Sequence, residues 1–162
     1  MNVSYDYTDR LVDLELLPHV SYPQGILDVG LSLTDADGVS RFTTGLEKLI
    51  QRYAVLFLTA LGSNAADINS GSEFATAVIR QQMVTRGQIV HFFALANTRV
   101  LQQLSAEDAS STLGAITPDE QIADAELLGY EIQTNSATVR LRIKLTNQAG
   151  DATTFVVPVS RL

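Results

Sequence analysis

The feature that most constrains this chain is an apolar helix followed at once by a loop between two glycines, in residues 45–74. Large apolar side chains recur there at spacings of three and four residues, the period of an amphipathic α-helix. They are Leu46, Leu49, Ile50, Tyr53, Phe57 and Leu61. Further apolar side chains lie between them, so we expect this helix to be buried on more than one side.

Local signals predict both ends of this first helix. Thr43 or Thr44 is suited to the N-cap, and Glu47 stands three residues after Thr44, as in a capping box. Gly62 is the expected C′ residue, because glycine readily adopts the positive φ that ends many helices. The sequence therefore predicts a helix over residues 45–61.

A short polar loop and a second helix are expected next. The loop spans residues 63–70 and has Ile68 as its single large apolar side chain. Either Ser70 or Ser72 can cap the second helix, because a serine hydroxyl accepts a hydrogen bond from the first turn. We expect this helix over residues 73–84.

Gly87 predicts a break before a third helix, over residues 88–104. The core face of this helix consists of Ile89, Phe93, Ala96, Val100 and Leu104. Residues 105–115 are small, acidic and polar, and are predicted to form a loop. Residues 117–120, Thr-Pro-Asp-Glu, place suitable side chains at N-cap, N1 and N3, and therefore predict a short helix.

The end of the chain is predicted to be antiparallel β-structure, with strands over residues 127–133, 139–145 and 153–159. The middle strand has the clearest two-residue alternation. Its apolar face consists of Val139, Leu141, Ile143 and Leu145, and its polar face of Arg140, Arg142 and Lys144. Pro158 marks the last strand as an edge, because proline cannot donate to a neighbouring strand.

The N-terminal quarter is predicted to contain a hairpin. Residues 26–33 alternate as a half-buried strand, a turn is expected at residues 35–38, and residues 39–43 can form the returning strand. A calcium loop is the alternative for this turn. Its twelfth position would be Leu46 where calcium requires an acid, so the turn is preferred.

Together these elements predict one α+β domain over residues 1–162, with residues 1–25 as an extended arm. Its parts are an N-terminal strand and hairpin, a three-helix core, a short proline-initiated helix and a C-terminal antiparallel β-hairpin. Hydrophobic residues make up 46% of the chain and charged residues 18%, which suits a globular domain.

The composition excludes several kinds of chemistry. The chain has no cysteine, which excludes disulfides, thiolate catalysis and cysteine-ligated metals. Neither a signal peptide nor an apolar run long enough to span a bilayer is apparent, so we expect cytosolic synthesis and no membrane partner. No P-loop, nucleophile elbow or dinucleotide fingerprint is present.

Charge is distributed in blocks of alternating sign. Residues 1–40 and 105–131 are acidic, the latter with seven acids and no base, whereas residues 41–104 and 132–162 are basic. Ordinary solvated surface and complementary faces within an assembly both explain this pattern. The net charge of −7 argues against nucleic acid as a partner.

No set of side chains indicates an active site. His19 and His91 lack metal-binding spacing, and His91 is expected to be a core or interface residue. A glycosidase needs two carboxyls across a sugar cleft. Structural roles explain the three acids of residues 45–74 better: Glu47 as a cap, Asp67 in a loop of small residues, and Glu73 in the first turn of a helix. We therefore expect no enzymatic activity, metal or cofactor.

Two short motifs carry a resemblance to a known family. The first is Leu58-Thr59-Ala60-Leu61-Gly62, and the second is Gly71-Ser72-Glu73-Phe74, which begins nine residues after Gly62. Both resemble the baseplate wedge family of phage T4-type contractile tails, often labelled lysozyme-like. The family's Glu-Arg pair after the first glycine is Ser63-Asn64 here, and its proline before the second glycine is Ile68.

The resemblance implies a structural virion protein in the tail baseplate. Members of the family sit around the tail tube in six-fold assemblies, contact other wedge subunits and start sheath assembly by offering strands to the first sheath ring. The residues expected at such interfaces are Gly62, Ser63, Asn64, Asp67, Gly71, Arg140, Arg142, Lys144, Phe155 and Val157. The alternatives are a tail-associated peptidoglycan hydrolase and another tail or head–tail adaptor.

The basic stripe of the middle C-terminal strand fits both a structural and a docking interpretation. Arg140, Arg142 and Lys144 are expected on the solvated face of a half-buried strand. An edge pair of strands with this face can also accept a partner's strand by β-augmentation. In that case backbone hydrogen bonds would supply affinity and the charges would fix the register.

Overall fold

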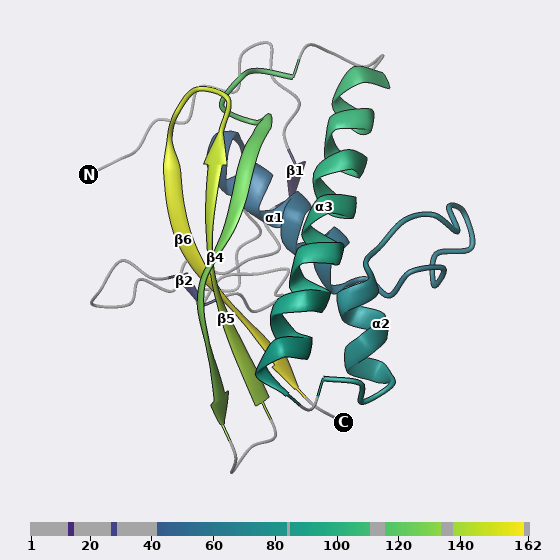
Figure 1. Cartoon of the computed structure of the whole chain (residues 1–162). Coiled ribbons are helices and arrows are strands. Elements are labelled where there is room, and N and C mark those ends of the chain that lie inside the picture. Colours follow the sequence, from purple (N-terminus) through teal and green to yellow (C-terminus); the bar gives the residue numbers. More distant parts are fainter. Residues whose placement is uncertain are drawn as a thin grey trace.

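The computed structural model describes residues 13–14, 27–28, 42–83, 85–110, 116–133 and 138–160. In these ranges the chain is an α+β structure with three helices and a main sheet built on three long antiparallel strands, to which a short parallel strand is added. The helices lie together on one face of the sheet (Figure 1). None of the described helices is both long and apolar enough to cross a membrane.

The first helix, α1 (Gly45–Leu58), ends earlier than predicted. Thr59 leaves the helix in an extended conformation, and Ala60 then forms a parallel bridge with Ser72. The bridge draws the backbone away from the helix axis, so the prediction of Gly62 as the C′ residue is wrong. Gly62 lies instead in the following turn, with a φ of +79°.

The start of α1 is stabilised by a distant residue. Thr44 occupies the N-cap position, but its side chain does not make the hydrogen bond predicted for a capping box. The Gly45 N–H donates to Glu120 Oε1 at 3.0 Å, from 75 residues away. A carboxylate suits this position because a helix N-terminus carries partial positive charge.

Helices α2 (Glu73–Ile79) and α3 (Arg86–Ser110) confirm that two separate helices follow the loop. The predicted position of the break is wrong, because α2 ends at Ile79 and Gly87 lies inside α3. Of the two predicted candidates, Ser72 is the N-cap of α2, and its Oγ accepts from the Ala75 N–H at 3.3 Å. The predicted core face of α3 is buried at all five positions. However, α3 continues through residues 105–110, which were predicted to be a loop.

The main sheet has the order β2-β6-β5-β4. Strands β4 (Ile122–Gln133), β5 (Thr138–Asn147) and β6 (Ala152–Ser160) are antiparallel neighbours, and the two-residue β2 (Leu27–Asp28) pairs in parallel with β6. The predicted alternation of β5 is confirmed, because its apolar side chains are buried and its basic side chains are exposed.

Two predictions about the strands and turns fail, and a third is not tested. The last strand is not an edge, because β2 pairs with β6 at Phe155 and Val156. This pairing ends before Pro158, so the missing N–H of the proline does not interrupt it. Strand β3 (Phe42–Thr43) pairs with β1 (Asp13–Leu14). Most of the hairpin predicted over residues 26–43 lies outside the described residues, so it stays a prediction. The short helix predicted at residues 117–120 is a turn.

An aromatic cluster joins the helices to the sheet. Tyr53 lies in a stacked arrangement with Phe57 at 5.7 Å between ring centroids, and edge-on to Phe155 of β6 at 6.0 Å. The Tyr53 hydroxyl donates to Asn97 Oδ1 at 2.8 Å, and Asn97 Nδ2 donates to the Ala125 carbonyl of β4 at 2.8 Å. One tyrosine therefore connects α1, α3 and two strands of the sheet, β4 and β6.

Tyr53 is expected to make stability fall at high pH. Burial, together with the charge of Asp124, raises the pKa of its hydroxyl above the ordinary value of 10.0. Unfolding therefore releases a proton above about pH 10, and the free energy of unfolding declines by up to about 1.4 kcal/mol per pH unit. Denaturant titrations at several alkaline pH values should show this slope.

Tyr53→Phe is expected to remove the contribution of Tyr53 to the fall of the unfolding free energy at alkaline pH. The variant also leaves Asn97 Oδ1 without its donor, which costs about 1 kcal/mol at every pH and does not affect the slope. An unchanged slope in the variant would assign the alkaline loss to other groups.

Candidate functional site

A loop between α1 and α2 is the most prominent projection of the described structure (Figure 1). Residues 62–69 are all exposed. Two side chains hold the loop backbone: Asn64 Oδ1 accepts from the Ala66 N–H and Asp67 Oδ1 from the Asn69 N–H, each at 3.0 Å. The Asp67 carbonyl also accepts from the Ser70 N–H at 3.1 Å. These Asx turns give the loop a defined shape.

The base of this loop is fastened to the helices. The Leu61 N–H donates to the Ser72 carbonyl at 3.2 Å, and the Ser72 N–H donates to the Thr59 carbonyl at 2.8 Å. The Gln103 side chain of α3 binds both backbone groups of Gly71, accepting from its N–H at 3.2 Å and donating to its carbonyl at 2.9 Å. The amide of Gln103 thus pairs with Gly71 as a neighbouring strand would.

Gly71 is required by its surroundings. Its φ is +102°, and a Cβ there would lie 2.6 Å from the Thr59 carbonyl oxygen. We expect Gly71→Ala to lower the free energy of unfolding by about 2–3 kcal/mol, because it combines positive-φ strain with a backbone collision. Gly129→Ala is the matched control, since nothing lies within 4 Å of its Cβ position. Equal stabilities of the two variants would contradict this assignment.

The basic stripe lies on the outer face of the sheet, as predicted, but acids of β4 face it. Glu126 lies directly opposite Lys144, and Glu131 directly opposite Arg140. Glu131 also approaches Arg142, with 4.0 Å between Oε1 and the guanidinium. Opposite charges across neighbouring strands stabilise a sheet modestly. The stripe therefore contributes to pairing within this chain before any partner is considered.

Two predicted interface residues lie in the core. The side chains of Phe155 and Val157 are fully buried and face the helices, so they present no surface to a partner. The alternation of β6 in the sequence did not reveal which face was covered. Gly71 is also buried, and its role is to support the loop. The exposed predicted residues are Gly62, Ser63, Asn64, Asp67, Arg140, Arg142 and Lys144.

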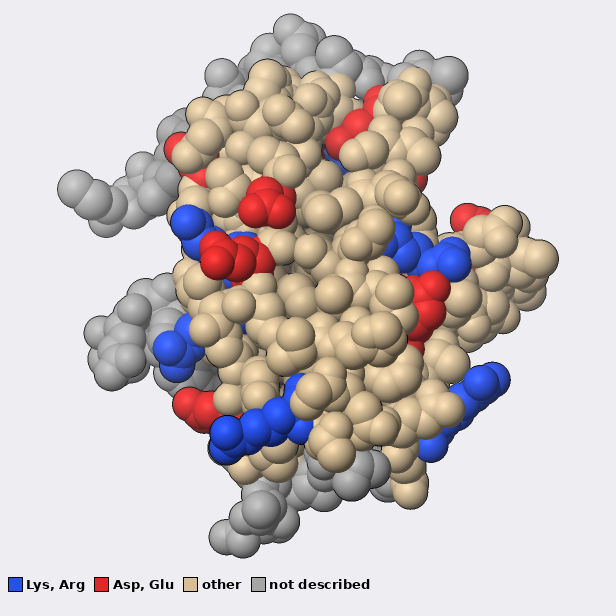
Figure 2. Space-filling model, in the orientation of Figure 1, with Lys and Arg blue, Asp and Glu red and all other residues tan. Residues whose placement is uncertain are grey.

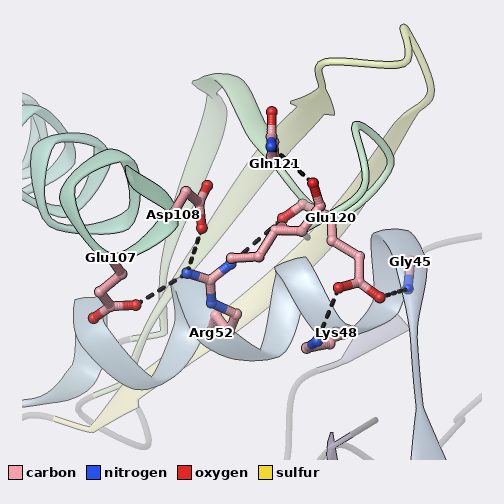
Figure 3. Close-up of polar contacts among 8 residues, drawn as sticks. Gly45, Lys48, Arg52, Glu107, Asp108, Glu120 and Gln121 are labelled. Carbon is pink, nitrogen blue, oxygen red and sulfur yellow. Dashed lines mark hydrogen bonds and ion pairs between the residues drawn. The ribbon is translucent and has the colours of Figure 1, made fainter. Parts of the chain in front are cut away.

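An ionic cluster joins α1 to the turn before β4 (Figure 3). Lys48 Nζ contacts Glu120 Oε2 at 2.8 Å, and the two side chains are only 10% and 3% exposed. Arg52 contacts Glu107 at 3.0 Å and Asp108 at 2.8 Å, and also donates to the Glu120 carbonyl at 3.4 Å. The acidic block of residues 105–131 therefore meets basic residues of the same chain.

The acids considered for a hydrolase have structural partners. Glu73 Oε1 accepts from Arg99 Nε at 2.6 Å, which ties α2 to α3, and Asp67 holds its own loop. His91 is exposed beside Phe92, so it is not a core residue, and its place at an interface stays a prediction. His19 lies outside the described residues. Those that are described contain no group of three or more metal-ligating side chains.

Sequence reasoning missed Glu120, Asn97 and Gln103, each of which makes polar contacts to residues far away in the sequence. Glu120 was noted only as part of a predicted helix start, and Gln103 was not singled out. A polar side chain next to a helix's apolar stripe was the available signal.

A search of protein-family models, curated proteins and solved structures found no match to this chain in any of the three.

Proposed function

We propose that the chain is a non-enzymatic structural subunit of a contractile tail, a baseplate wedge component that starts sheath assembly. The observation that carries this proposal is the geometry of the two glycine motifs. Gly62 and Gly71 both have positive φ, and between them lies the projecting loop whose ends are bridged and fastened to α3. The residues that carry the family resemblance therefore build one preorganised, exposed feature suited to docking.

Strand pairing at the sheet edge is the second part of the proposal. β4 is the last strand in the sheet order, and among the described residues it has no strand on its other side. Leu128 and Ile132 are exposed along it. In Figure 2 the surface beside β4 is mostly uncharged, and acidic side chains lie along β4 itself. We therefore propose that a sheath strand pairs with β4, and that the exposed loop contacts other wedge subunits.

One interaction limits where a strand can be added. Asn97 Nδ2 already donates to the Ala125 carbonyl, so α3 covers this edge near the start of β4. The open part is the section toward Gln133. Deleting the last strand is unsuitable as a test, because it would remove Phe155 and Val157 from the core.

The proposal is tested by isolating the assembly that contains the tagged full-length chain. Mass spectrometry and electron microscopy should find it with tube and sheath proteins in sheathed tubular particles. The hydrolase alternative is tested with the purified chain in a zymogram. A clearing band that disappears in Glu73→Gln would show enzymatic activity and overturn the proposal.

A further inference from the structure

Ile68 is the most exposed large apolar side chain of the described residues. It is 68% exposed, compared with 59% for Ile79 at the end of α2, and smaller fractions for the others. Its position matters more than its exposure, because it lies in the loop that projects furthest from the helices (Figure 1). Single exposed apolar residues are common, so the surrounding loop has to indicate whether this one has a role.

The loop around Ile68 is ordered by its own contacts and not by burial. Asp67, immediately before Ile68, accepts from the N–H of Asn69, immediately after it, so the side chain of Ile68 sits on a closed turn. The loop's first turn is closed by the Ser63 N–H donating to the Ala60 carbonyl at 3.0 Å. An anchor already held in one conformation loses little entropy when it binds.

Charge and composition define what such a loop can recognise. Asp67 is the only charged residue between Gly62 and Gly71, and the other neighbours of Ile68 are small or polar. A membrane surface is a poor fit, since the loop has neither the basic nor the aromatic side chains that bind one. Nucleic acid is a poor fit for the same lack of bases. An apolar pocket rimmed by hydrogen-bonding groups of a protein fits both the isoleucine and the exposed polar backbone.

We infer that Ile68 is the anchor residue of this loop and inserts into an apolar pocket of a different protein subunit in the same assembly. Gln103 acts as a positioning residue, because its two hydrogen bonds to Gly71 fix the base from which the loop projects. The docking of Ile68 rests on the proposed function for the identity of the assembly. It goes beyond that function by naming the contact residue and the chemistry of its pocket.

The test is a competition within cells that make the assembly. Native and Ile68→Asp chains carrying different tags are expressed together, and mass spectrometry gives their ratio in the purified particles. We expect Ile68→Asp to be depleted about 30-fold or more, as for loss of a binding hot spot. Ile79→Asp, the same change at a comparably exposed site, should be depleted less than about twofold. Thermal unfolding of both purified variants controls for folding.

Equal incorporation of Ile68→Asp and the native chain would overturn the inference while leaving the proposed function intact. Recovery of the native chain without any other subunit would overturn both. The occupant is checked with a photoreactive diazirine residue at position 68 in the full chain. Crosslinks to apolar residues of another polypeptide are expected, and crosslinks to lipid or to a second copy of this chain would contradict the stated partner.

The positioning role of Gln103 has a separate readout. In Gln103→Ala, hydrogen exchange of the Gly71 and Ser72 amides should become faster, and incorporation should fall although Ile68 is unchanged. Gln103→Glu should restore only part of both, because a carboxylate accepts from the Gly71 N–H but cannot donate to its carbonyl. Native incorporation of Gln103→Ala with faster exchange would show that the loop does not need this support.

Discussion

Replacing Glu120 with alanine is expected to lower the free energy of unfolding by about 3–5 kcal/mol. The carboxylate binds two donors of α1, the Gly45 N–H at 3.0 Å and Lys48 Nζ at 2.8 Å. Both side chains of the ion pair are almost completely buried. Without Glu120, the Lys48 ammonium group and the N-terminus of α1 each lose a buried carboxylate contact where little water can replace it. The quantity to measure is the equilibrium unfolding free energy in denaturant.

Glu107→Ala is the matched control for that loss. Glu107 also binds a cation of α1, Arg52 at 3.0 Å, but its side chain is 52% exposed. Exposed pairs contribute little, so we expect less than about 1 kcal/mol. Arg52 keeps its contact with Asp108 in this variant. Similar losses in both variants would show that burial does not decide the strength of these contacts.

Replacing Phe57 with alanine is expected to cost about 3–5 kcal/mol as well, because it leaves a cavity at the junction of the helices. The ring is fully buried, with Phe74 of α2 at 4.7 Å and Phe93 of α3 at 5.7 Å between centroids. A third aromatic neighbour is Tyr53, which also contacts Phe155 of the sheet. The loss is measured by the same denaturant titration.

Phe92→Ala provides the comparison within the aromatic residues of α3. Phe92 is only half-buried and packs at the margin of the core, so removing its ring exposes a surface and leaves no closed cavity. We expect a loss of about 1 kcal/mol. A larger effect for Phe92 than for Phe57 would mean that the centre of the core has been misplaced.

The periodic parts of this fold could be predicted from the sequence. Burial on one face of α3 and alternation along β5 follow directly from side-chain spacing, because each face meets the same environment along its length. Ser72 was also predictable, since its cap bond is to Ala75, three residues away. Geometry of this kind depends only on residues that are close together in the sequence.

The parts that failed depend on residues far apart in the chain. The N-terminus of α1 uses Glu120, so the local signals of Thr44 and Glu47 did not describe its cap. Residues 117–120 have the composition of a helix start, but there the side chain of Glu120 turns to α1 and the chain enters β4. No local pattern contains this contact.

The candidate site was predicted in part, for the same reason. The two glycines marked the loop, because positive φ is a local requirement, but Gln103 as its support comes from another helix. The charge blocks suggested either solvated surface or faces for partners. Several charged residues from blocks of opposite sign instead bind one another. Arg52 binds Asp108, and Lys48 binds Glu120. Paired charges inside the chain cannot be told from free ones by composition.

Electron cryomicroscopy of the particle that contains this chain tests the structural role most directly. We expect density for the chain in the baseplate around the tube, with the loop of residues 62–70 against another wedge subunit. A strand of the first sheath ring should lie along β4 toward Gln133. A sheathed particle in which the chain is absent from the baseplate, or in which both the loop and β4 face solvent, would contradict the account.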